Sequence, residues 1–239
     1  MSGHSHWSTI KHQKGAADAK RSKIFSKIAK IITVAAKEKG GDPETNSKLR
    51  LAMDQAKAAN MPQDNIERAI KRGAGELESE TLEEVMFEAY GPGGSAIIIE
   101  GITDNKNRTL GEIKQSLSQY SGKLGGEGSV KWMFNRKGCL TINSQEKDRE
   151  LLELTAIEAG AEDISWQGDR LNIYTKVEDL EKVKGALEEK GLKLEGASLD
   201  WVAKEEISVN EKEMETCQKL FEALDENDSV QEIYSNIKQ

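Results

Sequence analysis

Apolar residues in the first 75 positions recur at helical spacing and predict three helices. Between residues 16 and 39 they form a single stripe, made of Ile24, Phe25, Ile28, Ile31, Ile32 and Ala35. A second helix is expected up to about Asn60, with Asp42 as its N-cap and Pro43 at its first position. A short third helix is expected over 63–72. This part of the chain is therefore predicted to be a helical bundle.

Beyond an acidic linker at 74–81 (AGELESET), the periodicity changes to short strands that alternate with helices. Strands are expected at 85–89 and 96–99 around a GPGG turn, followed by a helix at 107–120. From Gly138 onward the order is strand, helix, two strands, helix and strand, which is the ferredoxin-like βαββαβ order. A helix at 211–224 and a strand at 230–234 follow this completed motif, so we expect the chain to return to the preceding domain.

These elements predict an α+β protein with a three-helix N-terminal domain followed by two α/β domains, at least one of them ferredoxin-like. The predicted boundaries are 1–77 for a basic helical domain and 78–137, completed by 206–239, for the middle domain. An inserted ferredoxin-like domain is expected at 138–205.

Charge is distributed very unevenly along the chain. The 239 residues carry 34 basic and 42 acidic side chains, a net charge of −8. Residues 1–75 hold 15 Lys/Arg against 7 Asp/Glu, and the remainder holds 19 against 35, so the two parts carry +8 and −16. This segregation predicts a polyanion-binding end on an acidic body. The absence of a long apolar run predicts no membrane partner, and two cysteines without a disulfide framework indicate the cytoplasm.

Four lysines of the first expected helix, Lys20, Lys23, Lys27 and Lys30, form a second stripe about 115° from the apolar one. A solvated helix face more often interleaves Glu with Lys, because such pairs stabilise a helix, so the row favours contact with phosphate. At the end of the third helix, three further cations either complement the helix dipole or extend this surface. The predicted nucleic-acid-binding residues are Lys11, Lys14, Lys20, Arg21, Lys23, Lys27, Lys30, Arg68, Lys71 and Arg72.

Two other segments offer secondary contacts. The polar run at 103–109 (TDNKNRT) supplies good helix caps, and alternatively its residues Asn105, Lys106, Asn107 and Arg108 contact a nucleic-acid backbone. Trp7, among basic residues, either stacks on a base or pins the N-terminal arm to the bundle.

Signals for catalysis are poor. All three histidines lie within the first twelve residues, and the glycine runs at 91–94 and 125–128 lack the Lys-Ser/Thr of a phosphate-binding loop. Cys139 and Cys217 fit buried positions better than reactive ones. We therefore expect no enzyme activity, no catalytic residue, no metal and no cofactor, and an enzyme that uses the glycine loops and nearby carboxylates is the less favoured alternative.

Several stretches together resemble the YebC/PmpR family, which also has a branch of mitochondrial translational activators. They are GHSHWSTIKHQKGAADAKRSKIFSKI, DPETNSKLRLAMDQAKAANMPQDNIERAIKRG, YGPGG, TDNKNRT, GSVKWMF and ALDENDSVQEIYSN. The resemblance covers nearly the whole chain and implies three domains and a cytoplasmic, non-enzymatic role in gene expression. One departure is His6, which stands where the family commonly has lysine.

Two functions follow from the resemblance and the charge pattern. The leading hypothesis is a DNA-binding transcriptional regulator, since bacterial members of the family are described as probable transcriptional regulators. The alternative is a ribosome-associated translation factor that binds ribosomal RNA and assists peptide-bond formation at stalled sequences. Phosphate contact is common to both, so the lysines do not separate duplex DNA from ribosomal RNA as the partner. The oligomeric state stays open.

Overall fold

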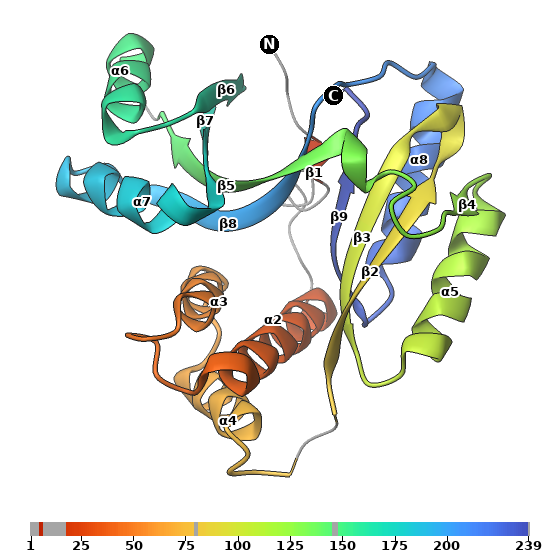
Figure 1. Cartoon of the computed structure of the whole chain (residues 1–239), viewed down its shortest axis with the longest axis horizontal. Helices are drawn as coiled ribbons and strands as arrows, with labels where there is room; N and C mark the ends of the chain where they lie inside the picture. Colours follow the sequence, from red (N-terminus) through yellow and green to blue (C-terminus); the bar gives the residue numbers. More distant parts are fainter. Residues whose placement is uncertain (1–4, 7–17, 79–80, 145–147, 239) are drawn as a thin grey trace.

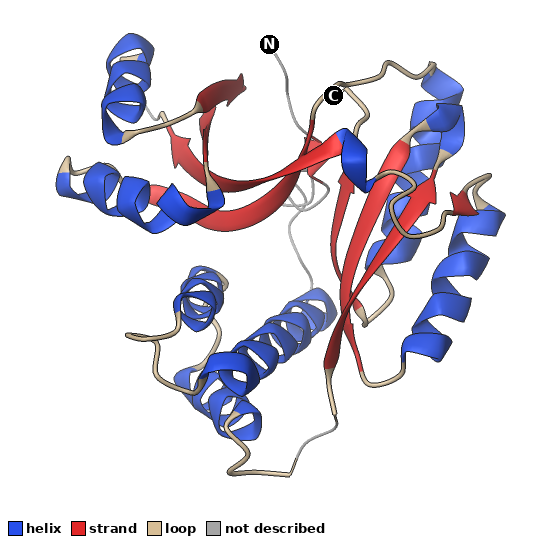
Figure 2. Cartoon of the chain, viewed as in Figure 1, coloured by secondary structure: helices blue, strands red, loops and turns tan. Residues whose placement is uncertain are grey.

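The computed structural model describes residues 5–6, 18–78, 81–144 and 148–238 and packs them into three units (Figures 1 and 2). A helical unit comes first, and a five-stranded sheet follows, with a four-stranded sheet inserted before the last strand of the five-stranded one. The predicted α+β class is confirmed. Within the described residues, no helix is both long enough and apolar enough to cross a bilayer.

The helical unit consists of α2 (Asp18–Lys39), α3 (Ser47–Ala58) and α4 (Gln63–Gly73). Its core is mainly aliphatic and includes Ile28, Ile32, Leu49, Ala52 and Ile66. These residues lie on the faces that the apolar spacing selects, so burial of that stripe explains why three modest helices hold together.

The predicted start of the second helix is wrong. Asn46, not Asp42, is the N-cap of α3, and its side-chain oxygen accepts a hydrogen bond from the Leu49 N–H at 3.0 Å. The Asn46 amide also donates to the carbonyls of Ala35 at 2.8 Å and Gly40 at 2.9 Å, while Asn46 itself is fully buried. Asn46 therefore caps one helix and satisfies the end of another, which helical periodicity alone does not reveal.

The first sheet has the strand order β1-β9-β3-β2-β4, and every pairing in it is antiparallel. Its strands are β1 (Ser5–His6), β2 (Glu83–Tyr90), β3 (Ala96–Thr103), β4 (Lys123–Leu124) and β9 (Val230–Ser235). The short helix η1 (Pro92–Gly94) turns β2 into β3. Two helices, α5 (Lys106–Gln119) and α8 (Glu211–Asp225), cover one face, where Ile99, Leu117 and Phe221 are buried together.

The second sheet has the order β6-β7-β5-β8 and confirms the predicted ferredoxin-like motif. Its elements are β5 (Phe134–Asn143), α6 (Arg149–Ala159), β6 (Asp163–Gln167), β7 (Arg170–Thr175), η3 (Val177–Asp179), α7 (Leu180–Glu189) and β8 (Leu194–Ala203). Since β5 already begins at Phe134, the sheet starts before the predicted boundary at residue 138. The three domain boundaries themselves stay a prediction.

The two sheets meet through an apolar cluster on the face of the first sheet that α5 and α8 leave uncovered. Its buried members come from both sheets and from the segment between them: Ala96, Ile98, Val130, Phe134, Ala203 and Tyr234. At its edge Glu100 accepts hydrogen bonds from Arg136 at 2.9 Å and from the Trp201 indole at 2.8 Å. This junction therefore has an apolar centre, and at its edge the Glu100 carboxylate has hydrogen-bond donors from both Arg136 and Trp201.

A buried carboxylate also fixes the glycine-rich segment that leads into β5. Glu88 of β2 accepts backbone hydrogen bonds from Gly128 at 2.6 Å and from Val130 and Lys131 at 2.7 Å each. Burial alone would raise the pKa of Glu88, but the three N–H donors outweigh it and hold the pKa below its usual value. At Gly128 φ is +79°, a conformation that favours glycine and lets this segment turn around the carboxylate.

Candidate nucleic-acid interface

Three of the predicted lysines form a row on α2 where this helix meets the end of α8, and we refer to Lys23, Lys27 and Lys30 as the lysine row. Lys27 Nζ lies 2.9 Å from a carboxylate oxygen of Asp225 and 3.0 Å from the Asp225 carbonyl oxygen. Lys23 donates to both the carbonyl and the carboxylate of Glu226, the latter at 2.9 Å. Lys30 donates to the carbonyl of Asp228 at 2.8 Å. The whole row thus contacts one turn of the chain.

We refer to residues 225–228 (DEND), at the end of α8, as the acidic turn. The last carbonyls of a helix have no partner within the helix and carry partial negative charge, so carboxylates at this end are unfavourable on their own. The last turn of α8 contains no basic residue. The lysine row supplies the missing cations from about 200 positions earlier in the sequence.

Burial differs across this contact. The side chains of Lys27 and Asp225 are only 11% and 15% exposed, whereas those of Glu226 and Asp228 are 73% and 77% exposed. The Lys27–Asp225 pair is therefore the protected centre of the contact, and the other carboxylates form a solvated rim, where salt screens charges strongly.

The start of α5 lies beside the same turn. Asn105 caps α5, because its side-chain oxygen accepts a hydrogen bond from the Arg108 N–H at 3.1 Å. Arg108 pairs with Asp104. The helix-cap role expected for this polar segment is therefore present in the structure. The hydrogen bond from Arg108 is the main cause of the lowered pKa of Asp104, and the charge of Lys30 adds to it. Asn227 of the acidic turn donates to Glu112 of α5 at 2.8 Å. The structure therefore brings three of the motifs singled out in the sequence to one place.

The other predicted residues lie elsewhere. Trp7, Lys11 and Lys14 are outside the described residues, and Lys20 is in the first turn of α2 with its side chain outside the description. Arg21, Lys106 and Asn107 are exposed near the lysine row. Three cations of α4, which packs against the later half of α2, are exposed: Arg68, Lys71 and Arg72.

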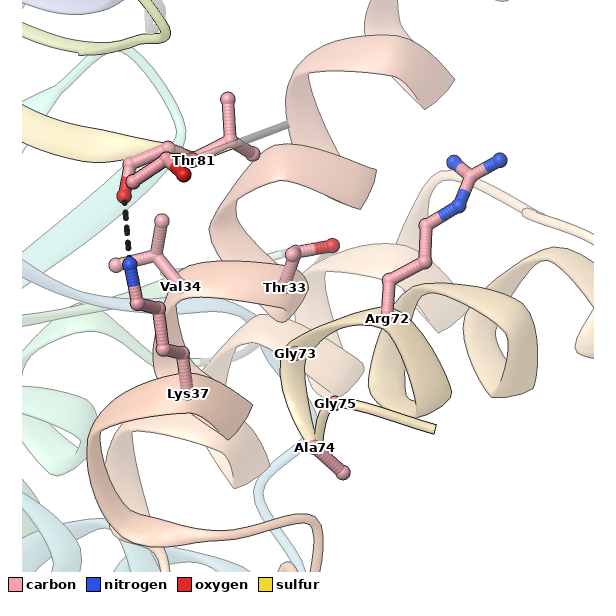
Figure 3. Close-up of a pocket in the computed structure, with 9 residues that line it drawn as sticks. Thr33, Val34, Lys37, Arg72, Gly73, Ala74, Gly75 and Thr81 are labelled. Atoms are coloured by element: carbon pink, nitrogen blue, oxygen red, sulfur yellow. Dashed lines mark hydrogen bonds between the residues drawn. The ribbon is translucent and has the colours of Figure 1, made fainter. Parts of the chain in front are cut away.

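A pocket between the later part of α2 and the end of α4 is lined by Thr33, Lys37 and Arg72, among others (Figure 3). Lys37 of α2 donates to the Leu82 carbonyl at 3.4 Å, and Arg72 extends away from it. The Thr33 hydroxyl is engaged with the carbonyls of Ala29 at 2.8 Å and Ala69 at 3.2 Å. Close approach of α4 to α2 requires Gly73, since a side chain there would collide with the Thr33 carbonyl. The polar groups around this pocket therefore do not converge on a common point.

A second contact holds the helical unit to the inserted sheet. Asp54 of α3 accepts from Lys184 of α7 at 2.5 Å, and Arg50 lies 3.3 Å from Glu181. Lys48 pairs with Glu84 of β2 at 2.7 Å. Leu51 of α3 adds an apolar contact to these ion pairs, since it packs against the core of the inserted unit.

Both cysteines are buried, as the sequence led us to expect. Burial is the main cause of the raised pKa of each thiol, Cys139 and Cys217, so neither is activated as a nucleophile. In the described part of the chain, no group of three or more His, Cys, Asp or Glu side chains is arranged to hold a metal ion. The absence of enzyme activity and of a cofactor stays a prediction.

Sequence reasoning found the lysines but missed their partner. The signal was available in three acidic residues, Asp225, Glu226 and Asp228, at the end of a predicted helix that has no Lys or Arg in its last turn. The lysine row has few acidic neighbours on α2, and the acidic turn has no basic neighbour in the last turn of α8. Each therefore supplies the opposite charge that the other lacks within its own helix.

Fold and site together define an α+β protein in which a basic helical unit is held by charge against two acidic α/β units. Models of two family regions match the chain: the TACO1/YebC N-terminal domain at residues 5–76, and the TACO1/YebC second and third domain at residues 82–237. The chain belongs to the TACO1/YebC family, which confirms the resemblance drawn from its motifs.

Relatives match along almost their whole length. A protein of Desulforapulum autotrophicum is 50% identical over 99% of this chain and 96% of its own. One of Geobacter sulfurreducens is 48% identical over 99% and 95%. Both bear the name probable transcriptional regulatory protein. The crystal structure of a conserved hypothetical protein from Aquifex aeolicus is similar with a TM-score of 0.90, at 43% identity over 97% of this chain and 96% of that one.

Proposed function

We propose that this protein is a nucleic-acid-binding regulator of gene expression, with duplex DNA as its leading target. The lysine row carries the proposal, because three ammonium groups on one side of α2 already coordinate anionic and carbonyl oxygens. Phosphate oxygens accept the same contacts, and cations along a helix release counterions when they meet a nucleic-acid backbone. The name that the relatives bear supports the regulatory part of this role.

The proposed surface continues from the lysine row onto neighbouring exposed cations. Arg21 precedes the row on α2, and Lys106 and Arg108 lie at the start of α5 next to the acidic turn. We assign phosphate contacts also to Lys11, Lys14 and Lys20 of the N-terminal segment, and weaker contacts to Arg68, Lys71 and Arg72. The role requires no catalytic residue and places the protein in the cytoplasm.

Ribosomal RNA is the alternative target, with the protein acting as a translation factor that assists peptide-bond formation at stalled sequences. One observation favours it: as long as the helical unit is docked, α3 lies against the inserted sheet through Asp54 and Arg50 and does not present a recognition helix to a major groove. Recognition through backbone and shape, which is typical of structured RNA, fits this arrangement.

Neutralisation of the row tests the proposal. Lys23→Gln, Lys27→Gln and Lys30→Gln together are compared with Lys114→Gln, Lys123→Gln and Lys212→Gln, which remove the same charge from exposed positions of the middle unit. In fluorescence titrations with duplex DNA or with a ribosomal RNA fragment, the row variant should bind more weakly and should lower the slope of log affinity against log salt, by at most about three. Equal affinity and slope for both triple variants would refute the proposal.

Competition at fixed salt separates the two targets. Co-sedimentation with ribosomes that excess duplex DNA does not displace would assign the protein to the ribosome. Binding to a defined operator at least about a thousandfold tighter than to random duplex would assign it to transcription.

A further inference from the structure

The lysine row is occupied in the closed molecule. The Nζ atoms of Lys23, Lys27 and Lys30 each donate to a backbone carbonyl of the acidic turn, and the first two also contact carboxylates at 2.9 Å. Lys27 as a residue is only 9% exposed. The acidic turn therefore occupies the positions beside these ammonium groups that a phosphate oxygen would take.

We infer that the acidic turn is an internal mimic of a phosphate backbone, which competes with nucleic acid for the lysine row. The inference rests on the proposed function and adds its regulation. Carboxylate and carbonyl oxygens of Asp225, Glu226 and Asp228 stand where phosphate oxygens would stand in the bound state. Nucleic acid therefore binds the row only when the helical unit separates from the end of α8.

The contacts that resist this separation include several ion pairs. Besides the row, the described residues contribute the pairs Lys48–Glu84, Arg50–Glu181 and Asp54–Lys184. In addition, α3 packs against β8, where the partly buried Leu51 contacts the core of the inserted unit. A polyanion offers the row the same chemistry as the acidic turn, and it gains counterion release in addition. Exchange of one anionic partner for another therefore opens the molecule, and the acidic turn sets the affinity that a nucleic acid must exceed.

This competition predicts an unusual dependence on salt. Salt weakens binding to nucleic acid, but it also weakens the contact that hides the row, so the two effects partly cancel. Affinity of the native protein should fall less steeply with salt than affinity of a variant whose acidic turn is neutral.

The test compares two triple variants of the full chain. Asp225→Asn, Glu226→Gln and Asp228→Asn neutralise the acidic turn, and Glu127→Gln, Glu189→Gln and Glu205→Gln remove the same charge from exposed sites elsewhere. With a 20-base-pair duplex and with an RNA hairpin as probes, the turn variant should bind at least about tenfold more tightly than the control at low salt, and with a steeper salt slope. Equal affinities and slopes would overturn the inference.

A distance measurement keeps the inference testable if the turn variant fails to fold. Spin labels on Lys57→Cys in α3 and Lys114→Cys in α5 report the separation of the helical and middle units, and the native cysteines are buried. Addition of the duplex should lengthen the distance distribution of the otherwise native protein. An unchanged distribution at saturating duplex would overturn the inference.

The two proposals fail in different ways. If the lysine-row variant described above binds as well as its own control, the proposed function is wrong and the inference falls with it. If that variant loses affinity while the turn variant matches its control and the labels do not separate, only the inference is wrong. Nucleic acid then reaches the cations without opening the molecule.

Discussion

The two junctions between the units of this molecule differ in the kind of contact that dominates them. The helical unit contacts the rest through ion pairs, among them Lys27–Asp225 and Asp54–Lys184, and through packing of Leu51. The two sheets are joined by buried apolar residues such as Ile98 and Phe134, with the Arg136–Glu100 pair at the edge. Salt weakens the first kind of contact and has little effect on the second, which depends on the exclusion of water. The comparison teaches that the junction of the helical unit is the one whose strength should depend on salt and on charged partners, whereas the junction of the two sheets should not.

The largest effect should come from the centre of the apolar junction. Phe134 is 4% exposed and packs with residues of both sheets. Phe134→Ala should lower the free energy of unfolding by about 3–5 kcal/mol, because the cavity left between the sheets cannot collapse fully. Chemical denaturation measures this loss, and it should be the same at 50 mM and 500 mM salt. A loss that depends strongly on salt would contradict the division into charged and apolar junctions.

A smaller effect is expected at Glu88, the buried carboxylate that fixes the segment leading into this junction. Glu88 holds Val130, a member of the apolar cluster, through backbone hydrogen bonds. Glu88→Gln should destabilise the protein by about 1–3 kcal/mol, because an amide oxygen replaces a charged acceptor of three N–H groups. Denaturation of both proteins at pH 7 measures the difference.

The pH dependence of the same variant provides the control. Because the folded-state pKa of Glu88 is lowered, its contribution is present above the unfolded-state pKa, about 4.3, and is lost as the pH falls through the folded value. The difference between native protein and Glu88→Gln should therefore shrink below about pH 4. A difference that stays constant down to pH 3 would show that the ionised carboxylate is not responsible.

The apolar half of this comparison could largely be predicted from the sequence, because helices, strands and the ferredoxin-like order depend on local periodicity. The strand at Ile97 and the helix through Leu117 are such cases. The start of α3 could not, since Asn46 is fixed by carbonyls of the neighbouring helix. The charged junction could be predicted only in part. The spacing along α2 predicts the lysine row, but packing between the units decides that Asp225 is the partner of Lys27.

Loss of the Lys27–Asp225 ion pair should weaken docking of the helical unit by less than Phe134→Ala destabilises the fold, but by more than the loss of an exposed pair. Lys27→Met removes the ammonium group that lies 2.9 Å from the Asp225 carboxylate, and the Asp225 side chain is only 15% exposed. Docking of the helical unit should weaken by about 1.5–3 kcal/mol, the range for hydrogen bonds between charged groups. With the spin labels at positions 57 and 114, the two units should separate at lower salt than in the native protein. Separation at the same salt concentration would place the strength of this junction elsewhere.

The smallest effect is expected at the rim of the charged junction. Lys48, whose side chain is 37% exposed, pairs with Glu84 at 2.7 Å and with Glu38 at 2.9 Å. Burial acts to lower the pKa of Lys48, but the hydrogen bonds to Glu84 and Glu38 outweigh it, so the pKa is raised. Lys48→Met should weaken docking by no more than about 1 kcal/mol, because solvent screens an exposed pair.

The raised pKa of Lys48 also fixes where its effect should vanish. The stabilisation is fully present below the unfolded-state pKa of lysine, about 10.4, and is lost as the pH rises through the folded value. The label separation measured across salt at pH 8 should therefore differ slightly between Lys48→Met and native protein, and the difference should fade above pH 11. If Lys48→Met opened the junction at the same salt concentration as Lys27→Met, the exposed and the buried ion pair would contribute equally to docking. That result would contradict the assignment of the buried Lys27–Asp225 pair as the strongest contact of this junction.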